Sequence, residues 1–192
     1  MIAAAAVFAL LMGLLFGGFG IVRAMGRNRL YQSASVQQPV LQEALKEETL
    51  TEGESEKWQD GWVKYKDVIY AYNEEILTFL IMGIDKLSDV EEVAEGTDGG
   101  QADALFLTVL NPKTKRTTVI GINRNTMTDI DVYGESGEYV STVKSQIAIQ
   151  HGFGNGMEES CEYQKKAVSN LFYQMPVHGY AAVNMSAVAT IN

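Results

Sequence analysis

The sequence has few of the residues from which many catalytic and metal sites are built. Its 192 residues include one cysteine, two histidines and three prolines. A single cysteine excludes an intrachain disulfide and a CxxC metal site, so Cys161 is expected to be a small buried hydrophobe. The sequence contains neither a Ser-His-Asp order nor a P-loop. We therefore expect His151 and His178 to be structural or solvated, with a place for His151 in a pocket wall as the alternative.

Positive charge is also scarce. The chain has 15 Lys and Arg against 24 Asp and Glu, which gives a formal net charge of -9. Residues 36–60 alone hold seven acidic residues and two lysines. An acidic chain repels the phosphates of nucleic acids, so the composition argues against a DNA- or RNA-binding function.

The chain begins with a long run that lacks charge. Residues 2–22 contain no charged side chain, and a helix of about 20 apolar residues spans the roughly 30 Å hydrocarbon core of a bilayer. A cleaved signal peptide would have a shorter apolar run and an Ala-x-Ala exit. We therefore predict an uncleaved transmembrane anchor at residues 1–23. Arginines follow this run and no basic residue precedes it, so the positive-inside rule alone places the rest in the cytoplasm, unless a basic leader is missing from this start.

A polar segment separates the anchor from the globular part. Residues 24–75 are rich in Glu, Gln and Lys, which predicts an acidic, partly helical stalk. Towards its end, apolar residues recur at helical spacing, and we predict a short helix packed on the domain edge. An aromatic anchor at the membrane interface is the alternative. The residues concerned are Trp58, Trp62, Tyr65, Val68 and Ile69.

The globular part begins near Ile76. Short apolar runs at 76–82 and 104–110 predict buried strands, and residues 116–122 predict a third strand. The turn at 111–115 is so short that the second and third strands must be antiparallel neighbours. Further elements are predicted as a strand at 128–133, a flexible loop at 151–156, a helix at 157–174 and a strand at 180–184.

Three polar side chains occur at the ends of these strands. Asp85 follows the first strand, Asp103 immediately precedes the second, and Arg124 follows the third. The end of the third strand lies beside the start of its antiparallel partner, so Arg124 and Asp103 should share one edge of the sheet. Asp85 joins them if the first strand runs parallel to the third. Two carboxylates and a guanidinium suit a magnesium-assisted pyrophosphate site. The structural alternative is an aspartate in a turn, an aspartate that caps a strand, and an arginine paired with either of them.

The order and spacing of these segments resemble the LytR-CpsA-Psr (LCP) domain over about residues 76–192. This resemblance implies an α/β fold, with a mixed sheet flanked by helices and a hydrophobic tunnel for a polyprenyl chain. It also implies one N-terminal membrane helix and an extracytoplasmic domain. We prefer this orientation to the cytoplasmic one that the positive-inside rule alone gives. The matching segments are FLIMGID at 79–85, QADALFL at 101–107, NPKTK at 111–115, IGINRNT at 120–126, Lys144 with His151-Gly152, and YAAVN at 180–184.

The resemblance further implies a phosphotransferase of cell-envelope biogenesis. Such an enzyme moves a glycopolymer, of the teichoic acid or capsule type, from a polyprenyl-pyrophosphate carrier to peptidoglycan with the help of Mg2+. Asp85 and Asp103 match the metal-linked aspartates of the family. Arg124 matches the arginine that contacts the pyrophosphate, and Arg124 and Asp103 are the catalytic candidates. The substrate-binding candidates are Arg124, Gln101, Asn125 and Lys144.

Two positions depart from the family pattern. Gln101 stands in a Gln-Ala-Asp where the family often has Arg-Ser-Asp, so one phosphate-binding cation is absent. Asn125 stands in an Asn-Arg-Asn where the family often has Pro-Arg-Asp, so an amide replaces a carboxylate. The alternative function is therefore a non-catalytic module that binds polyprenyl phosphate or a wall polymer, and a membrane-tethered structural domain is a third.

The chain ends at Asn192, inside what reads as a new helix. We therefore expect it to be truncated. An incomplete sheet would expose apolar surface and an unpaired edge, which predicts poor solubility.

Overall fold

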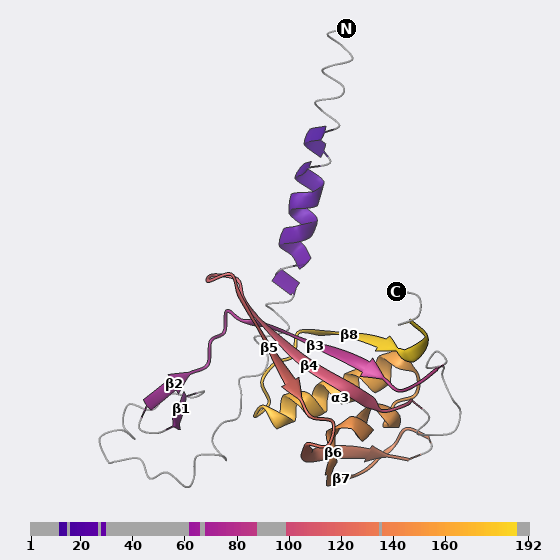
Figure 1. The fold of residues 1–192 in the computed structure, drawn as a ribbon. Helices are drawn as coiled ribbons and strands as arrows, with labels where there is room; N and C mark the ends of the chain where they lie inside the picture. The colour runs from indigo at the N-terminus through magenta and orange to yellow at the C-terminus, as the bar shows by residue number, and fades with distance from the viewer. Residues whose placement is uncertain are drawn as a thin grey trace, which may run out of the picture. The chain divides into compact units, whose positions relative to one another are not determined.

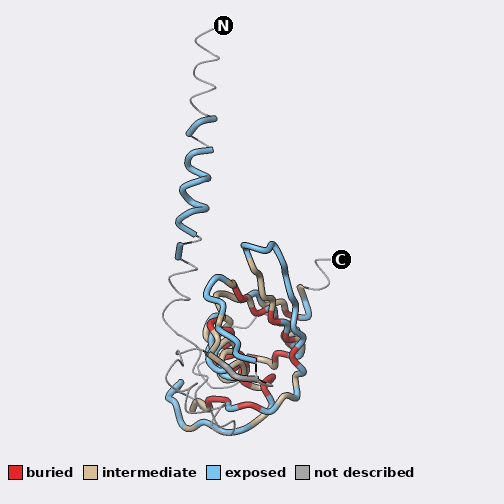
Figure 2. The backbone as a smooth tube through the Cα atoms, turned by 90° about the vertical axis from the view of Figure 1, so that its left-hand side faces the viewer, coloured by how far each residue is buried: buried red, intermediate tan, exposed pale blue. Residues whose placement is uncertain are grey.

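The structure is a computed structural model of the chain, which divides into two compact units, Met1–Val36 and Gln37–Asn192. In the first unit, the helical residues 16–26 expose their large apolar side chains (Figure 2). No helix within the described ranges is both long and apolar enough to cross a membrane. Most of the predicted stalk and residues 1–11 of the predicted anchor lie outside those ranges. The described residues are 12–14, 16–26, 28–29, 62–65, 68–87, 99–134 and 136–187.

The second unit contains a four-stranded mixed sheet (Figure 1). It is formed by β3 (Leu77–Ile84), β4 (Ala102–Asn111), β5 (Arg116–Ile122) and β8 (Gly179–Asn184), in the order β5-β4-β3-β8. β4 pairs antiparallel with both β3 and β5, whereas β8 pairs parallel with β3. The predicted pairing of the second and third strands is confirmed, and the first strand runs in the same direction as the third.

Side chains alternate between the two faces of the sheet along each strand, and one of these faces is buried in the core. Leu80 and Met82 of β3 are at most 1% exposed, and they pair in register with Leu107 and Leu105 of β4. The helix α3 (Met157–Leu171) belongs to the same core through Cys161, Ala167 and Val168. Burial of Cys161, predicted from its sequence context, is confirmed.

The opposite face of the sheet has exposed apolar side chains. Ile81 of β3 and Phe106 of β4 are register partners, and they are 43% and 45% exposed. Val119 of β5 is 59% exposed. Their exposure agrees with the expected apolar surface, while the predicted poor solubility stays a prediction.

The prediction of a short helix around Trp58–Ile69 is wrong for the residues of this segment that the structure describes. These residues form a hairpin of β1 (Trp62–Tyr65) and β2 (Val68–Ala71), and Trp58 lies outside the described residues. Aromatic and β-branched residues favour strands, and in so short a segment this preference outweighs an apparent helical spacing.

A second hairpin follows the main sheet. β6 (Met127–Tyr133) corresponds to the predicted strand at 128–133, and β7 (Tyr139–Gln146), which was not predicted, pairs with it. The start of the predicted flexible loop at 151–156 belongs instead to a 3-10 helix, η1 (Ile147–Phe153). β7 escaped prediction because most of its residues are exposed and polar, which hides the alternation of a half-buried strand.

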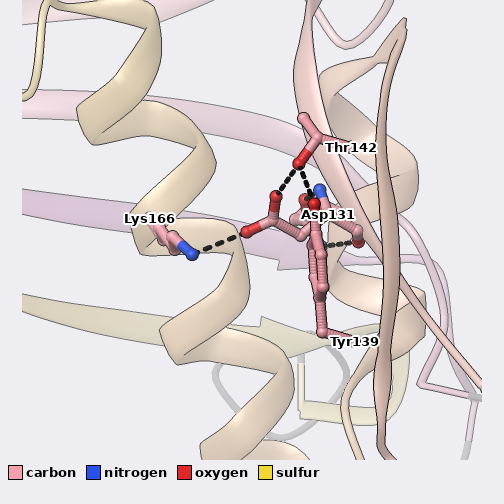
Figure 3. Close-up of polar contacts among 5 residues, drawn as sticks. Asp131, Tyr139, Thr142 and Lys166 are labelled. Carbon is pink, nitrogen blue, oxygen red and sulfur yellow. Dashed lines mark hydrogen bonds and ion pairs between the residues drawn. The ribbon is translucent and has the colours of Figure 1, made fainter.

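A nearly buried carboxylate joins the β6–β7 hairpin to α3. Asp131 is 8% exposed, and it accepts hydrogen bonds from Lys166 Nζ at 2.6 Å and Thr142 Oγ1 at 2.7 Å (Figure 3). The hydroxyl of Tyr139 lies 2.8 Å from Thr142 Oγ1. Burial opposes the ionisation of Asp131, but the two hydrogen bonds and the charge of Lys166 outweigh it and lower its pKa. The hydrogen bond to Asp131 raises the pKa of Lys166, so the pair is ionised at neutral pH.

Buried amide side chains fix η1 to the elements around it. The side-chain amide of Gln150 in η1 forms two hydrogen bonds with the backbone of Asp131, one as acceptor and one as donor. Its Oε1 accepts from the Asp131 backbone nitrogen at 2.8 Å, and its Nε2 donates to the Asp131 carbonyl oxygen at 2.9 Å. Gln164 of α3 accepts from the backbone nitrogen of His151 at 3.0 Å and donates to the Ile147 carbonyl oxygen at 3.1 Å. η1 is therefore held by both the hairpin and α3.

His151 is fully buried at the centre of this framework. Its Nδ1 lies 3.2 Å from the carbonyl oxygen of Gly100, and its Nε2 lies 3.7 Å from Cys161 Sγ. Burial lowers the pKa of His151, and the backbone oxygens near it offset only part of that effect. The imidazole is therefore neutral at pH 7, and its expected structural role agrees with this environment.

Replacing Asp131 with asparagine should lower the free energy of unfolding by about 1–3 kcal/mol, because a nearly buried carboxylate loses its charged hydrogen bond to the exposed Lys166. Denaturant titration followed by circular dichroism would measure the loss. Asp129→Asn is the matched control, because the Asp129 side chain is 64% exposed and lies 4.0 Å from Lys144. It should stay within about 0.5 kcal/mol of wild type. Equal losses in the two variants would contradict the role of Asp131.

The two histidines should make stability depend on pH. Burial lowers the pKa of both His151 and His178 below the ordinary 6.5. Near and below pH 6.5, the histidines of the unfolded chain bind protons that the histidines of the folded chain do not. Their contribution to the free energy of unfolding is therefore present above pH 6.5 and is lost as the pH falls below it. The slope should be at most about 1.4 kcal/mol per pH unit for each histidine. Denaturant titrations at several pH values, with NMR titration of both rings, would test it; a ring titrating above pH 6.5 would contradict it.

Candidate functional site

The three side chains predicted to converge lie at one edge of the sheet. Arg124, which follows β5, forms an ion pair with Asp103 near the start of β4. Nη2 of Arg124 also donates to Gln101 Oε1 at 2.8 Å. The backbone nitrogen of Gln101 donates to Asp85 Oδ1 at 2.6 Å. The structure thus brings Asp85, Asp103 and Arg124 together, and Gln101 links them.

A bulge at the end of β3 contributes to the position of Asp85. The register between β3 and β4 shifts between Gly83 and Ile84, and such a bulge bends the strand and redirects the next side chain. The Asp85 backbone nitrogen then donates to the Gln101 carbonyl oxygen at 3.1 Å. Gly100 has a φ of 73°, a left-handed conformation that glycine adopts without a steric penalty, and it leads the chain into β4.

The loop that carries Arg124 is held by η1. The backbone nitrogen of Ala148 donates to the Arg124 carbonyl oxygen at 3.3 Å, and that of Ile147 donates to the Thr126 carbonyl oxygen at 2.8 Å. The side chains of Arg124 and Asp103 are each 38% exposed. The guanidinium is therefore oriented by fixed acceptors and still accessible, which is the arrangement that favours bidentate phosphate binding.

A cavity of about 410 Å3 lies beside this edge. Its walls differ in character, because one carries a carboxylate, an ammonium and an amide, and the other carries apolar side chains from η1. A small-molecule site often has this combination, in which apolar surface gives affinity and a few polar groups fix orientation. The lining residues are Asp85, Lys86, Gly100, Gln101, Ile149, Gly152 and Phe153.

The apolar wall depends on a close approach between η1 and α3. A Cβ atom on Gly154 would lie 2.1 Å from the backbone nitrogen of Ser160, so no larger residue fits there without movement. Ser160 Oγ donates to the Gly154 carbonyl oxygen at 3.1 Å. This contact holds the end of η1, and with it Phe153, against the start of α3.

Of the two remaining candidates, Asn125 follows Arg124 in the chain, whereas Lys144 belongs to the second hairpin. Lys144 is on β7 opposite Asp129, with a side chain that is 69% exposed. Asn125 is exposed, and its backbone nitrogen donates to Asn123 Oδ1 at 2.9 Å. Neither lines the cavity, and neither do Arg124 and Asp103; of the linked group, Asp85 and Gln101 line it. His151 does not line this cavity, because its ring is fully buried, whereas Gly152 beside it does.

Sequence reasoning missed several residues of the cavity wall. Lys86 could have been suspected only from its position next to Asp85. Ile149 and Phe153 could not be assigned, because a flexible loop was expected where η1 turns them towards the sheet edge. The glycines around Phe153 were the one signal that this segment makes close contacts.

Among the residues that the structure describes, Asp85 and Asp103 are the carboxylates of the linked group that could bind a cation at this edge. Within residues 62–87, 99–134 and 136–187, so far as they are described, no group of three or more His, Cys, Asp or Glu side chains could hold a metal ion. Two carboxylates nevertheless fit the donor set that Mg2+ takes from proteins, because it keeps several waters and draws other ligands from substrate phosphates.

The chain is similar to several known proteins. The polyisoprenyl-teichoic acid–peptidoglycan teichoic acid transferase TagU of Enterococcus faecalis is 24% identical over 123 residues, which cover 64% of this chain and 34% of that protein. The crystal structure of Bacillus subtilis TagU is 26% identical, with a TM-score of 0.40 over 59% of this chain and 36% of that one. Protein gbs0355 of Streptococcus agalactiae is 22% identical, with a TM-score of 0.42 over 58% and 34%.

The chain thus spans about a third of the length of these relatives. The model of the LytR_cpsA_psr family matches residues 35–191, which is most of the chain. The predicted resemblance is confirmed, and the chain belongs to the LytR-CpsA-Psr family.

Proposed function

We propose that the chain binds the pyrophosphate of a polyprenyl-linked glycopolymer at Arg124 and takes part in the transfer of that polymer to peptidoglycan. The observation that carries this proposal is the partly exposed guanidinium of Arg124, which is oriented by Asp103 and by Gln101, a residue that lines a cavity of about 410 Å3. A planar cation of this kind matches pairs of phosphate oxygens. The activity named for the related TagU of Enterococcus faecalis supports the same substrate class.

In the proposed reaction, a hydroxyl of peptidoglycan attacks the phosphorus atom that carries the glycopolymer. A new P–O bond forms to that hydroxyl oxygen, whose proton passes to solvent, and the P–O bond to the departing polyprenyl phosphate breaks. Arg124 would stabilise the negative charge that accumulates on the phosphate oxygens. Asp103 contacts the guanidinium and would keep it directed at them. Mg2+ held by Asp85 and Asp103 would neutralise further phosphate charge.

The same proposal includes a place for the chain at the cell membrane. Residues 2–22 carry no charge, which supports a single-pass anchor at residues 1–23 with the following domain outside the cytoplasm. Peptidoglycan is the acceptor in the proposed reaction, and an extracytoplasmic domain would meet it there.

A second candidate function is binding of polyprenyl phosphate or a wall polymer without turnover. Gln101 favours it, because its uncharged amide oxygen accepts a hydrogen bond from Arg124 at the position where the family pattern often has a cation. Asn125 also favours it, because an amide cannot take the proton of an attacking hydroxyl. The two candidates share the phosphate-binding role of Arg124 and differ in whether polyprenyl phosphate is released.

Arg124→Ala should abolish release of polyprenyl phosphate from a polyprenyl-pyrophosphate-linked glycopolymer and weaken binding of the lipid. Arg124→Lys should recover only part of the binding, since an ammonium is a point charge without the planar fork. Lys165→Gln is the matched control, because it removes one positive charge from the α3 ion pair with Glu162 and should leave both readouts unchanged. Release should also require Mg2+.

The experiment uses full-length protein in detergent and measures lipid binding by native mass spectrometry beside product release. Wild-type protein that binds but never releases product would favour the second candidate. Unchanged binding in Arg124→Ala would exclude both.

Restoring the family pattern separates the two candidates in another way. Gln101→Arg adds a cation beside Arg124 and should strengthen pyrophosphate binding roughly tenfold, as one more charge-assisted hydrogen bond would. Asn125→Asp adds a carboxylate and should raise turnover more than binding if the chain is an enzyme. A double variant that gains affinity but no turnover would identify a binding module, and one that gains neither would argue against a phosphate site at this edge.

A further inference from the structure

The turn between β4 and β5 concentrates positive charge in an acidic chain. We call residues 111–116 the basic turn, because Lys113, Lys115 and Arg116 fall within four positions. Residues 104–128 contain no Asp or Glu, whereas the whole chain has a net charge of -9. The basic turn is therefore a local reversal of the charge of the chain.

The cations of the basic turn are accessible. Residues 112–120 are all exposed, and the turn forms the free end of the β4–β5 hairpin (Figure 1). Lys113 forms an ion pair with Glu75. In the part of the chain that the structure describes, neither Lys115 nor Arg116 has an ion-pair partner, so their charge is available to a ligand.

The shape of the basic turn is fixed by its own backbone contacts. Asn111 Oδ1 accepts hydrogen bonds from the backbone nitrogens of Lys113 and Thr114, both at 3.0 Å. Lys115 has a φ of 56°, a left-handed conformation that glycine or asparagine adopts more easily. A residue in this conformation commonly closes a hairpin loop after a turn, so it fixes the backbone from which the Lys115 and Arg116 side chains project.

A second cavity, also of about 410 Å3, opens next to the basic turn. Arg116 lines it together with the hydroxyl side chains of Thr114 and Thr118. Ile76 and Val109 supply apolar surface to the same cavity. A guanidinium and hydroxyls suit a phosphodiester, and the apolar surface suits the glycerol and first methylene groups of a phospholipid.

We propose that the basic turn docks on the anionic phospholipid headgroups of a bilayer. Its cations are spread over a projecting tip, which suits a charged surface better than a single small anion. The chain also enters the sheet at this end, because Leu77 pairs with Leu110 and Glu75 reaches Lys113. Each Lys or Arg close to an anionic bilayer strengthens binding roughly fivefold. This inference goes beyond the proposed reaction and does not depend on it.

Docking would orient the domain. The basic turn and Arg124 flank opposite ends of β5, whose seven residues span roughly 23 Å at ~3.3 Å each. A domain that docks by the basic turn would hold the Arg124 edge away from the headgroups, so a polyprenyl-linked donor would have to be drawn partly out of the bilayer to reach Arg124.

The test measures the distance of the basic turn from the bilayer, because the apolar N-terminal segment of the full chain is expected to bind vesicles of any charge. A donor fluorophore on Thr114→Cys reports energy transfer to acceptor-labelled headgroups, and the native Cys161 is fully buried and unreactive under native conditions. Transfer should be stronger in vesicles containing phosphatidylglycerol than in pure phosphatidylcholine. High salt should abolish the difference, since the contact is electrostatic.

In this labelled background, the double change Lys115→Gln and Arg116→Gln should weaken docking roughly 25-fold, from two charges at about fivefold each. The matched control, Lys144→Gln with Lys165→Gln, removes two positive charges elsewhere and should leave the energy transfer to the headgroups unchanged. Equal transfer in both kinds of vesicle, or an equal loss in the control, would overturn the proposal. Loss of transfer on adding glycerol phosphate would also overturn it, in favour of a soluble ligand. Product release is measured separately, so failure here leaves the Arg124 proposal standing.

Discussion

The contact of Arg124 with Asp103 and Gln101 is the interaction on which the site depends. It joins the end of β5 to the start of β4, and Gln101 extends it to Asp85 at the end of β3. Pairing of the three strands places these residues at one edge, and η1 fixes the loop that carries Arg124 through its backbone. The sheet therefore supplies the positions, and the elements after it supply the rigidity that a phosphate site requires.

The framework behind the site is held by buried polar groups rather than by apolar packing alone. Gln150 connects η1 to Asp131, and Asp131 in turn binds Lys166 of α3. His151 of η1 contacts the carbonyl oxygen of Gly100, the residue before Gln101. A disturbance of these buried groups would move both the cavity wall and the loop that carries Arg124, because η1 holds each of them, so the stability and the geometry of the site are linked.

The strands and the convergence of Asp85, Asp103 and Arg124 could be predicted because strand period, a short turn and antiparallel pairing are local properties of the sequence. The β1–β2 hairpin was missed because aromatic residues at a spacing of three or four fit two structures over so short a segment. Lys144 was placed with the substrate by family resemblance, whereas the structure places it opposite Asp129 in the β6–β7 register. The cavity wall was missed because it requires η1 to pack on α3, a tertiary contact that no local pattern reports.

The central claim is that Arg124 receives a pyrophosphate. A crystal structure of the full chain with farnesyl pyrophosphate and Mg2+ would test it most directly. The account predicts pyrophosphate oxygens on the Arg124 guanidinium, a cation between them and Asp85 or Asp103, and the isoprenoid chain against Ile149 and Phe153. Pyrophosphate bound elsewhere, with Arg124 still closed onto Asp103 and Gln101, would contradict it.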